Sequence, residues 1–250
     1  MPDAPAAPEP SPGAPATPHL TARPVPWQRA FAWYGEAMRL FKRAPATWIG
    51  LALAALATEF ALEAVPEVGP PLGRIVDPLV SCGMVYAAAY VDRGAAPSIR
   101  LALRAFRAPA AAIVAVILAS FTTLGAETLT ASWLADVNLL ASGATSPELS
   151  VPQVSLIFAA GILASLPVTF VPFHVLLERV GIRAAFAASW RAFVANPAPL
   201  LAYAGMSLAL LLMALLTMGI GLALALPLWA ASSFAAWKDV FAIGDLAAIE

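Results

Sequence analysis

Two side chains in the second half of the chain have the types and the spacing to hold a metal ion or to move a proton. His174 and Glu178 are four residues apart, so they would share one face of a helix. An imidazole and a carboxylate can ligate a metal or exchange a proton near neutral pH. Metal sites normally need three or four ligands, however, and a histidine near a helix end also serves as an anchor at the membrane interface. Both interpretations stay open at this point.

Four charged residues form a second candidate site, because charged side chains at membrane depth are functional by default. They are Glu59, Glu63, Arg74 and Asp77, which lie in or between two long apolar stretches. Arg74 could pair with Asp77 or, across a hairpin, with Glu63, which would make the cluster a structural ion pair. Alternatively, the four side chains line a polar cavity that binds a substrate or a headgroup. Glu127 is a further candidate, unless it simply lies among the outer headgroups.

The motifs of common enzyme classes are absent from the sequence. It contains no His-Glu-x-x-His, no Gly-x-Ser-x-Gly and no Gly-x-x-x-x-Gly-Lys, which are the motifs of zinc, acyl-transfer and phosphate-binding sites. We therefore predict a protein that is not an enzyme, with no catalytic residues, no cofactor and no metal ion.

A group of basic residues is suited to contact anionic lipid headgroups. Each Lys or Arg close to an anionic leaflet contributes about 1 kcal/mol of binding free energy. The group consists of Arg39, Lys42, Arg43, Arg100, Arg104, Arg107, Arg183 and Arg191. The alternative is that these residues only fix the orientation of the chain in the membrane.

A short motif, Arg-x-Phe followed three or four residues later by proline, occurs three times. Before each proline, apolar and basic residues alternate with helical period, which predicts amphipathic helices lying in the membrane interface. Proline ends such a helix and is well tolerated in the first turn of the next one. The motifs run from Arg39 to Pro45, from Arg104 to Pro109 and from Arg191 to Pro197.

The composition places most of the chain in lipid. Hydrophobic residues make up 61% and charged residues 12% of the 250, and the mean hydropathy is +0.81, outside the range usual for soluble proteins. Since about 20 apolar residues cross a bilayer, six crossings are expected. They are 46–65, 72–91, 110–133, 152–177 and the two halves of 198–237, with a turn at 217–221.

We therefore predict an all-α, polytopic membrane bundle of six transmembrane helices in three hairpins, each preceded by an amphipathic interfacial helix. Two details stay open. The third helix crosses either in full or only as far as Gly125, and Pro167 and Pro172 either kink the fourth helix or break it.

The distribution of Lys and Arg predicts the orientation. All of the 14 basic residues except Arg74 fall on one side of the six crossings, and positive residues are retained in the cytoplasm. Both termini are thus expected to be cytoplasmic, and the alanine-rich composition, with far more arginine than lysine, suggests a bacterial inner membrane. Residues 1–26 hold nine prolines and read as a disordered tail, followed by a membrane domain at 27–241 and a short cytoplasmic tail at 242–250.

Three features resemble a family of uncharacterised bacterial six-helix inner-membrane proteins. They are the Phe-to-Pro spacing of the motif, Asp77-Pro78-Leu79, and Pro227-Leu228 followed by Ala236-Trp237-Lys238-Asp239-Val240-Phe241. More distantly, that group is similar to the membrane domain fused to some glycerophosphoryl diester phosphodiesterases. The resemblance spans residues 27–241 and implies a fold and a membrane location. It implies no site residues, because those enzymes carry catalysis in a separate soluble domain that has no counterpart in these 250 residues.

These observations favour a structural or lipid-organising protein, or a scaffold, in the bacterial inner membrane. Its expected partners are membrane lipids, including anionic headgroups, and unidentified proteins, with no nucleic acid. A small permease is the first alternative, and it predicts a continuous polar route from Glu63 and Asp77 toward His174. A membrane subunit of a separately encoded enzyme is the second alternative.

Overall fold

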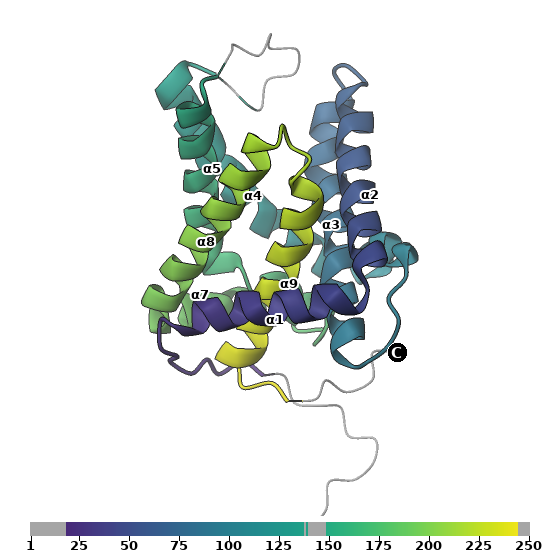
Figure 1. The fold of residues 1–250 in the computed structure, drawn as a ribbon, viewed down its shortest axis with the longest axis vertical. Coiled ribbons are helices and arrows are strands. Elements are labelled where there is room, and N and C mark those ends of the chain that lie inside the picture. Colours follow the sequence, from purple (N-terminus) through teal and green to yellow (C-terminus); the bar gives the residue numbers. More distant parts are fainter. Residues whose placement is uncertain (1–18, 138, 140–148, 245–250) are drawn as a thin grey trace, which may run out of the picture.

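The structure is a computed structural model that describes residues 19–137, 139 and 149–244. Over this part the chain forms nine α-helices and three short 3-10 helices (Figure 1), so the prediction of an all-α fold is confirmed. The elements are α1 (Arg29–Arg43), α2 (Pro45–Glu63), α3 (Gly69–Asp92), η1 (Ile99–Leu103), η2 (Ala105–Arg107), α4 (Ala110–Ala135), α5 (Val151–Ser165), η3 (Leu166–Val168), α6 (Val171–Leu176), α7 (Ile182–Ala195), α8 (Pro197–Leu216) and α9 (Leu222–Val240).

Five helical segments of the described chain are long and apolar enough to cross a membrane. They are α2, α3, α4, the continuous stretch Val151–Val168 and α8. The sequence predicted six crossings, and the sixth segment, α9, does not meet the same criterion although it has 19 residues. It carries Lys238 and Asp239, and ten of its residues are buried against other helices. A helix surrounded by other helices needs fewer apolar side chains than one that faces lipid, because most of its surface contacts protein instead of acyl chains.

The segments expected to be interfacial helices gather at one end of the bundle, which we call the elbow end (α1, η1, η2 and α7). In Figure 1, α1 lies across the lower ends of the long helices. The second segment differs from the prediction, because it forms two 3-10 turns and not an amphipathic α-helix. Pro97 and Pro109 bound this segment closely, which favours short 3-10 turns over a longer helix.

The fourth apolar stretch is broken, so of the two alternatives for Pro167 and Pro172 the structure has the interruption. The α-helix stops at Ser165, continues as the 3-10 turn η3 and restarts as α6 at Val171. Pro167 and Pro172 supply no amide hydrogen to continue the ladder of hydrogen bonds. The third stretch, by contrast, forms one helix through Gly125 to Ala135, so that helix does not end at Gly125.

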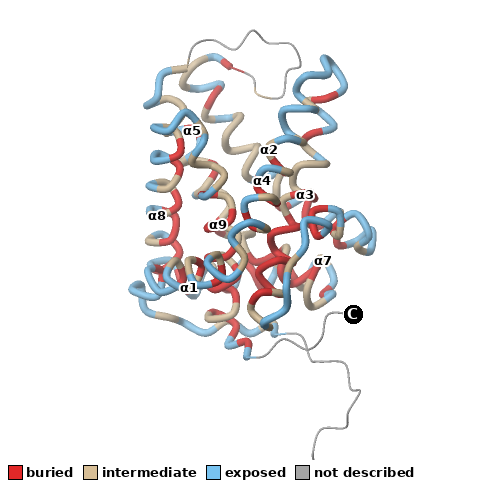
Figure 2. Tube along the Cα trace, turned by 45° about the vertical axis from the view of Figure 1, so that its right-hand side comes forward, coloured by how far each residue is buried: buried red, intermediate tan, exposed pale blue. Residues whose placement is uncertain are grey.

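Buried residues concentrate toward the elbow end (Figure 2). The largest of them are Trp33, Trp48 and Trp237, none of which is more than 1% exposed. The opposite end, which we call the loop end, holds the α2–α3 and α8–α9 turns, and most of its residues are exposed or of intermediate burial (Figure 2). The candidate site residues therefore lie in two surroundings: between helices at the loop end, and against buried aromatic side chains at the elbow end.

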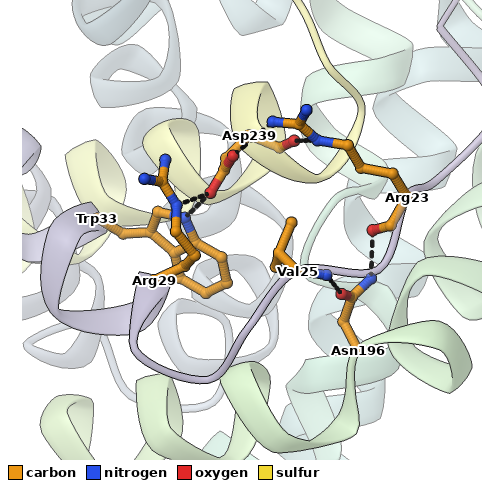
Figure 3. Close-up of polar contacts among 6 residues, drawn as sticks. All are labelled: Arg23, Val25, Arg29, Trp33, Asn196 and Asp239. Carbon is orange, nitrogen blue, oxygen red and sulfur yellow. Dashed lines mark hydrogen bonds and ion pairs between the residues drawn. The ribbon is translucent and has the colours of Figure 1, made fainter.

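Residues 19–26, which we call the N-terminal strap, have a defined position although their composition predicted disorder. The amide of Arg23 donates to the carbonyl of Val240 at 2.8 Å, and the amide of Val25 donates to Oδ1 of Asn196 at 2.7 Å. Nδ2 of Asn196 in turn donates to the carbonyl of Arg23 at 3.0 Å (Figure 3). Residues 19–26 therefore pack on the helices, while residues 1–18 of the predicted tail lie outside the described residues.

Candidate functional site

A cavity of about 370 Å³, lined by both polar and apolar side chains, lies at the loop end between α2, α3 and α4. All four charged residues that the sequence singled out as a cluster line it: Glu59, Glu63, Arg74 and Asp77. Glu127 of α4 lines the same cavity, so it faces the cluster across the helix interface. We call this space the loop-end cavity.

Helix geometry brings these groups together. Glu59 and Glu63 are one turn apart at the end of α2, and Asp77 is about one turn beyond Arg74 on the antiparallel helix α3. The facing side of α4 adds hydroxyl groups that sequence reasoning missed, at Ser120 and Thr123, with Ser81 from α3. The signal for them was the helical spacing of Ser120, Thr123 and Glu127, which places all three on one face.

Arg74 does not form the ion pair that one interpretation of the cluster required. Among the described residues it makes no ion pair with Asp77 or Glu63. Its Nη2 donates instead to the backbone carbonyl of Leu139, in the loop after α4. The carboxyl groups of the cavity are thus left without a bonded cation from the described part of the chain.

Two glycines leave room for the carboxyl groups of Asp77 and Glu127. A Cβ atom on Gly73 would lie 3.0 Å from Oδ2 of Asp77, and one on Gly161 of α5 would lie 2.3 Å from Oε1 of Glu127. The other oxygen of Asp77, Oδ1, is buried and has no hydrogen-bond partner among the described residues. Because such an acceptor costs free energy unless it is paired, Asp77 is the group most in need of a donor.

Among the described residues, the loop-end cavity does not continue as a polar route through the bundle. One turn deeper than Ser81 lies Val85, and one turn deeper than Ser120 lies Val116, and both valines are buried. His174 does not line this cavity. The continuous polar route that the permease hypothesis predicted is therefore not seen in the part of the chain that the structure describes.

His174 is a core residue, joined to Glu178 as the spacing predicted. It is 0% exposed, and its Nδ1 lies 2.7 Å from Oε2 of Glu178. The sequence missed the third member, His19 of the strap, whose Nδ1 lies 2.8 Å from Oε1 of the same carboxylate. Burial opposes ionisation of Glu178, but hydrogen bonds from His174 and His19 hold its pKa below the usual range. Within the described ranges, no three His, Cys, Asp or Glu residues are placed to hold a metal.

The eight predicted lipid contacts divide into two groups. Four are engaged by the protein: Arg39 bonds Glu36, Arg43 donates to the carbonyl of Val91, Arg104 donates to Oη of Tyr90, and Arg191 donates to the carbonyl of Ala187. The guanidinium of Arg104 also lies over the rings of Tyr86 and Tyr90, at 5.0 and 5.6 Å from their centroids. These four side chains are at least partly committed to the fold.

The other four are exposed, and their side chains make no hydrogen bond or ion pair with any described residue. They are Lys42, Arg100, Arg107 and Arg183. Large apolar side chains stand exposed on the same segments: Phe31 on α1, Leu103 on η1 and Trp190 on α7 are 55%, 62% and 56% exposed. The elbow end therefore combines free positive charge with free apolar surface.

A second cavity, of about 580 Å³, lies at the elbow end between α1 and α9. Its acids are already matched: Asp239 is paired with Arg23 and Arg29, and Asp92 with Lys238. We interpret this cavity as part of the attachment of the strap.

Comparisons of the chain with protein-family models, with curated proteins and with solved structures found no match.

Proposed function

We propose that this chain is a non-enzymatic, six-crossing protein of the bacterial inner membrane whose elbow end faces the cytoplasm and holds anionic lipid. The observation that carries the proposal is the set of four unpaired basic side chains, Lys42, Arg100, Arg107 and Arg183, beside exposed apolar ones. An amphipathic surface of this kind fits the boundary between acyl chains and acidic headgroups.

The sixth crossing in this proposal is α9. It runs from the loop end back to the elbow end beside α8 (Figure 1) and packs on α1, α2 and α3. With six crossings, the strap and the end of α9 lie on the same side of the membrane, as does the basic surface. Retention of positive residues in the cytoplasm supports the orientation.

The expected contribution of the basic side chains is modest singly and substantial together. Each adds about 1 kcal/mol close to an anionic leaflet, so the loss of two lowers the affinity roughly thirtyfold. The protein would thereby keep acidic lipid around its elbow end, which is a lipid-organising role that requires no reaction.

Native mass spectrometry of the full chain with phosphatidylglycerol tests the proposal. Arg100→Gln combined with Arg107→Gln is expected to lower the retained lipid roughly thirtyfold. The control is Arg39→Gln, because Arg39 is 43% exposed but already bonded to Glu36. Equal retention by the double variant and the unchanged protein would contradict the proposal, and so would an equal loss in the control.

A further inference from the structure

We propose that the loop-end cavity binds an organic ammonium group, carried either by a zwitterionic lipid headgroup or by a free amine. This site is independent of the anionic-lipid surface, since it lies at the opposite end of the bundle and has the opposite charge.

The charge of the lining favours a cation. Four carboxyl groups and a single guanidinium group line the cavity, and that guanidinium donates to the carbonyl of Leu139. Glu59 and Glu63 are exposed, whereas Asp77 and Glu127 are half-buried, and a partly buried carboxylate loses hydration free energy unless a positive group or a hydrogen-bond donor replaces it. The unpaired Oδ1 of Asp77 is the acceptor best placed to receive an N–H donor.

The size and spacing of the site favour an organic cation over a bare metal ion. No trio of acids in the described part of the chain is close enough to ligate a metal, whereas about 370 Å³ is within the range of small-molecule sites. Apolar walls at Leu62, Phe121 and Leu124 accompany the acids. Such walls contact the carbon atoms of an amine, and an aromatic ring also attracts its charge.

Arg74 explains why a zwitterion fits. A guanidinium group has five N–H donors, and only one hydrogen bond of Arg74 is seen among the described residues. The remaining donors can hold the phosphate of a headgroup while Asp77 and Glu127 hold its ammonium group. A free amine would use the acids alone, so Arg74 distinguishes the two sources.

The test uses the full-length protein in detergent and native mass spectrometry with three probes: phosphatidylethanolamine, phosphatidylglycerol with the same acyl chains, and free ethanolamine. The first is expected to be retained at one per chain and the second far less. Asp77→Asn and Glu127→Gln are each expected to lower that retention about tenfold, as for loss of a charge-assisted hydrogen bond. The matched control, Glu67→Gln, removes an exposed acid from the α2–α3 turn outside the cavity and is expected to change nothing.

The possible outcomes distinguish a lipid headgroup from a free amine, and they also include results that would overturn the proposal. Loss of phosphatidylethanolamine in Arg74→Gln, with no ethanolamine bound, supports the lipid headgroup, whereas bound ethanolamine that survives Arg74→Gln supports a free amine. If the acid variants do not fold, the test is whether the unchanged protein retains phosphatidylethanolamine or ethanolamine in preference to phosphatidylglycerol. Equal retention of the two lipids without ethanolamine binding overturns the proposal, as does a control that fails like Asp77→Asn. Neither result bears on Arg100 and Arg107.

Discussion

Arg23 and Asp239 are 216 positions apart in the chain, yet Nη2 of Arg23 donates to Oδ1 of Asp239 at 2.8 Å. The other oxygen, Oδ2, accepts from Nε of Arg29 at 2.6 Å and from Nε1 of Trp33 at 2.8 Å (Figure 3). The Asp239 side chain is only 7% exposed. One carboxylate thus joins the N-terminal strap, α1 and α9.

Asp239→Asn is expected to release the strap. The amide group keeps one acceptor but loses the charge and places an N–H group toward donors, which costs about 2 kcal/mol. Hydrogen exchange at the amides of Arg23 and Val25 should then become at least tenfold faster. Asp136→Asn is the control, because Asp136 is exposed and its left-handed backbone suits asparagine. Unchanged exchange in the Asp239 variant would show that other contacts hold the strap.

Arg104→Gln is expected to destabilise the protein, although Arg104 was predicted to contact lipid. The change removes the hydrogen bond to Tyr90 and the contact with two aromatic rings, together worth roughly 1–3 kcal/mol. Thermal unfolding in detergent measures the effect. Arg107 lies three residues after Arg104 and is exposed, and Arg107→Gln should unfold as the unchanged protein does. Full stability of the Arg104 variant combined with loss of anionic lipid would return Arg104 to the lipid contacts.

Gly83→Ala is expected to separate η1 from α3. An added Cβ would lie 2.6 Å from Cα of Ala102 and 2.8 Å from its nitrogen, and the backbone must shift to accommodate it, at a cost of roughly 1–3 kcal/mol. Gly205→Ala in α8 is the matched control, since nothing lies within 4 Å of its added Cβ. That change should stabilise the helix by about 0.4–1 kcal/mol. Thermal unfolding of both variants checks the contrast, and similar midpoints would contradict the close contact at Gly83.

The contribution of Glu178 to stability is expected to depend on pH. The pKa of Glu178 is lower in the folded protein than its ordinary value of 4.5, because hydrogen bonds from His174 and His19 outweigh the effect of burial. A lowered pKa stabilises the fold above the ordinary value, and the stabilisation is lost as the pH falls through the folded pKa. The difference in unfolding midpoint between the unchanged protein and Glu178→Gln should therefore be constant above about pH 5 and shrink below 4.5. A difference that stays constant down to pH 3 would contradict this role.

The membrane-spanning helices and the loop-end cluster could be predicted because they depend on local spacing. Glu59 and Glu63 are one helical turn apart, and a short turn brings them opposite Arg74 and Asp77. The contribution of Gly161 to this site could not be predicted, because Gly161 leaves space for Glu127, which is on another helix. The two prolines of the fourth stretch indicated a distortion of the helix there, but prolines alone do not distinguish a kink from an interruption.

By itself, the sequence determined the all-helical class, the apolar segments and the interfacial helices before Pro45 and Pro197, since periodicity, length and proline act within a few residues of one another. Only the tertiary structure decided which basic groups are free and which are bonded. Arg104 and Arg107 have the same charge and are three residues apart, but only the guanidinium of Arg104 lies over the rings of Tyr86 and Tyr90. Likewise, only packing brought Arg23 to Asp239. Such pairings depend on how distant helices pack, and local spacing carries no information about them.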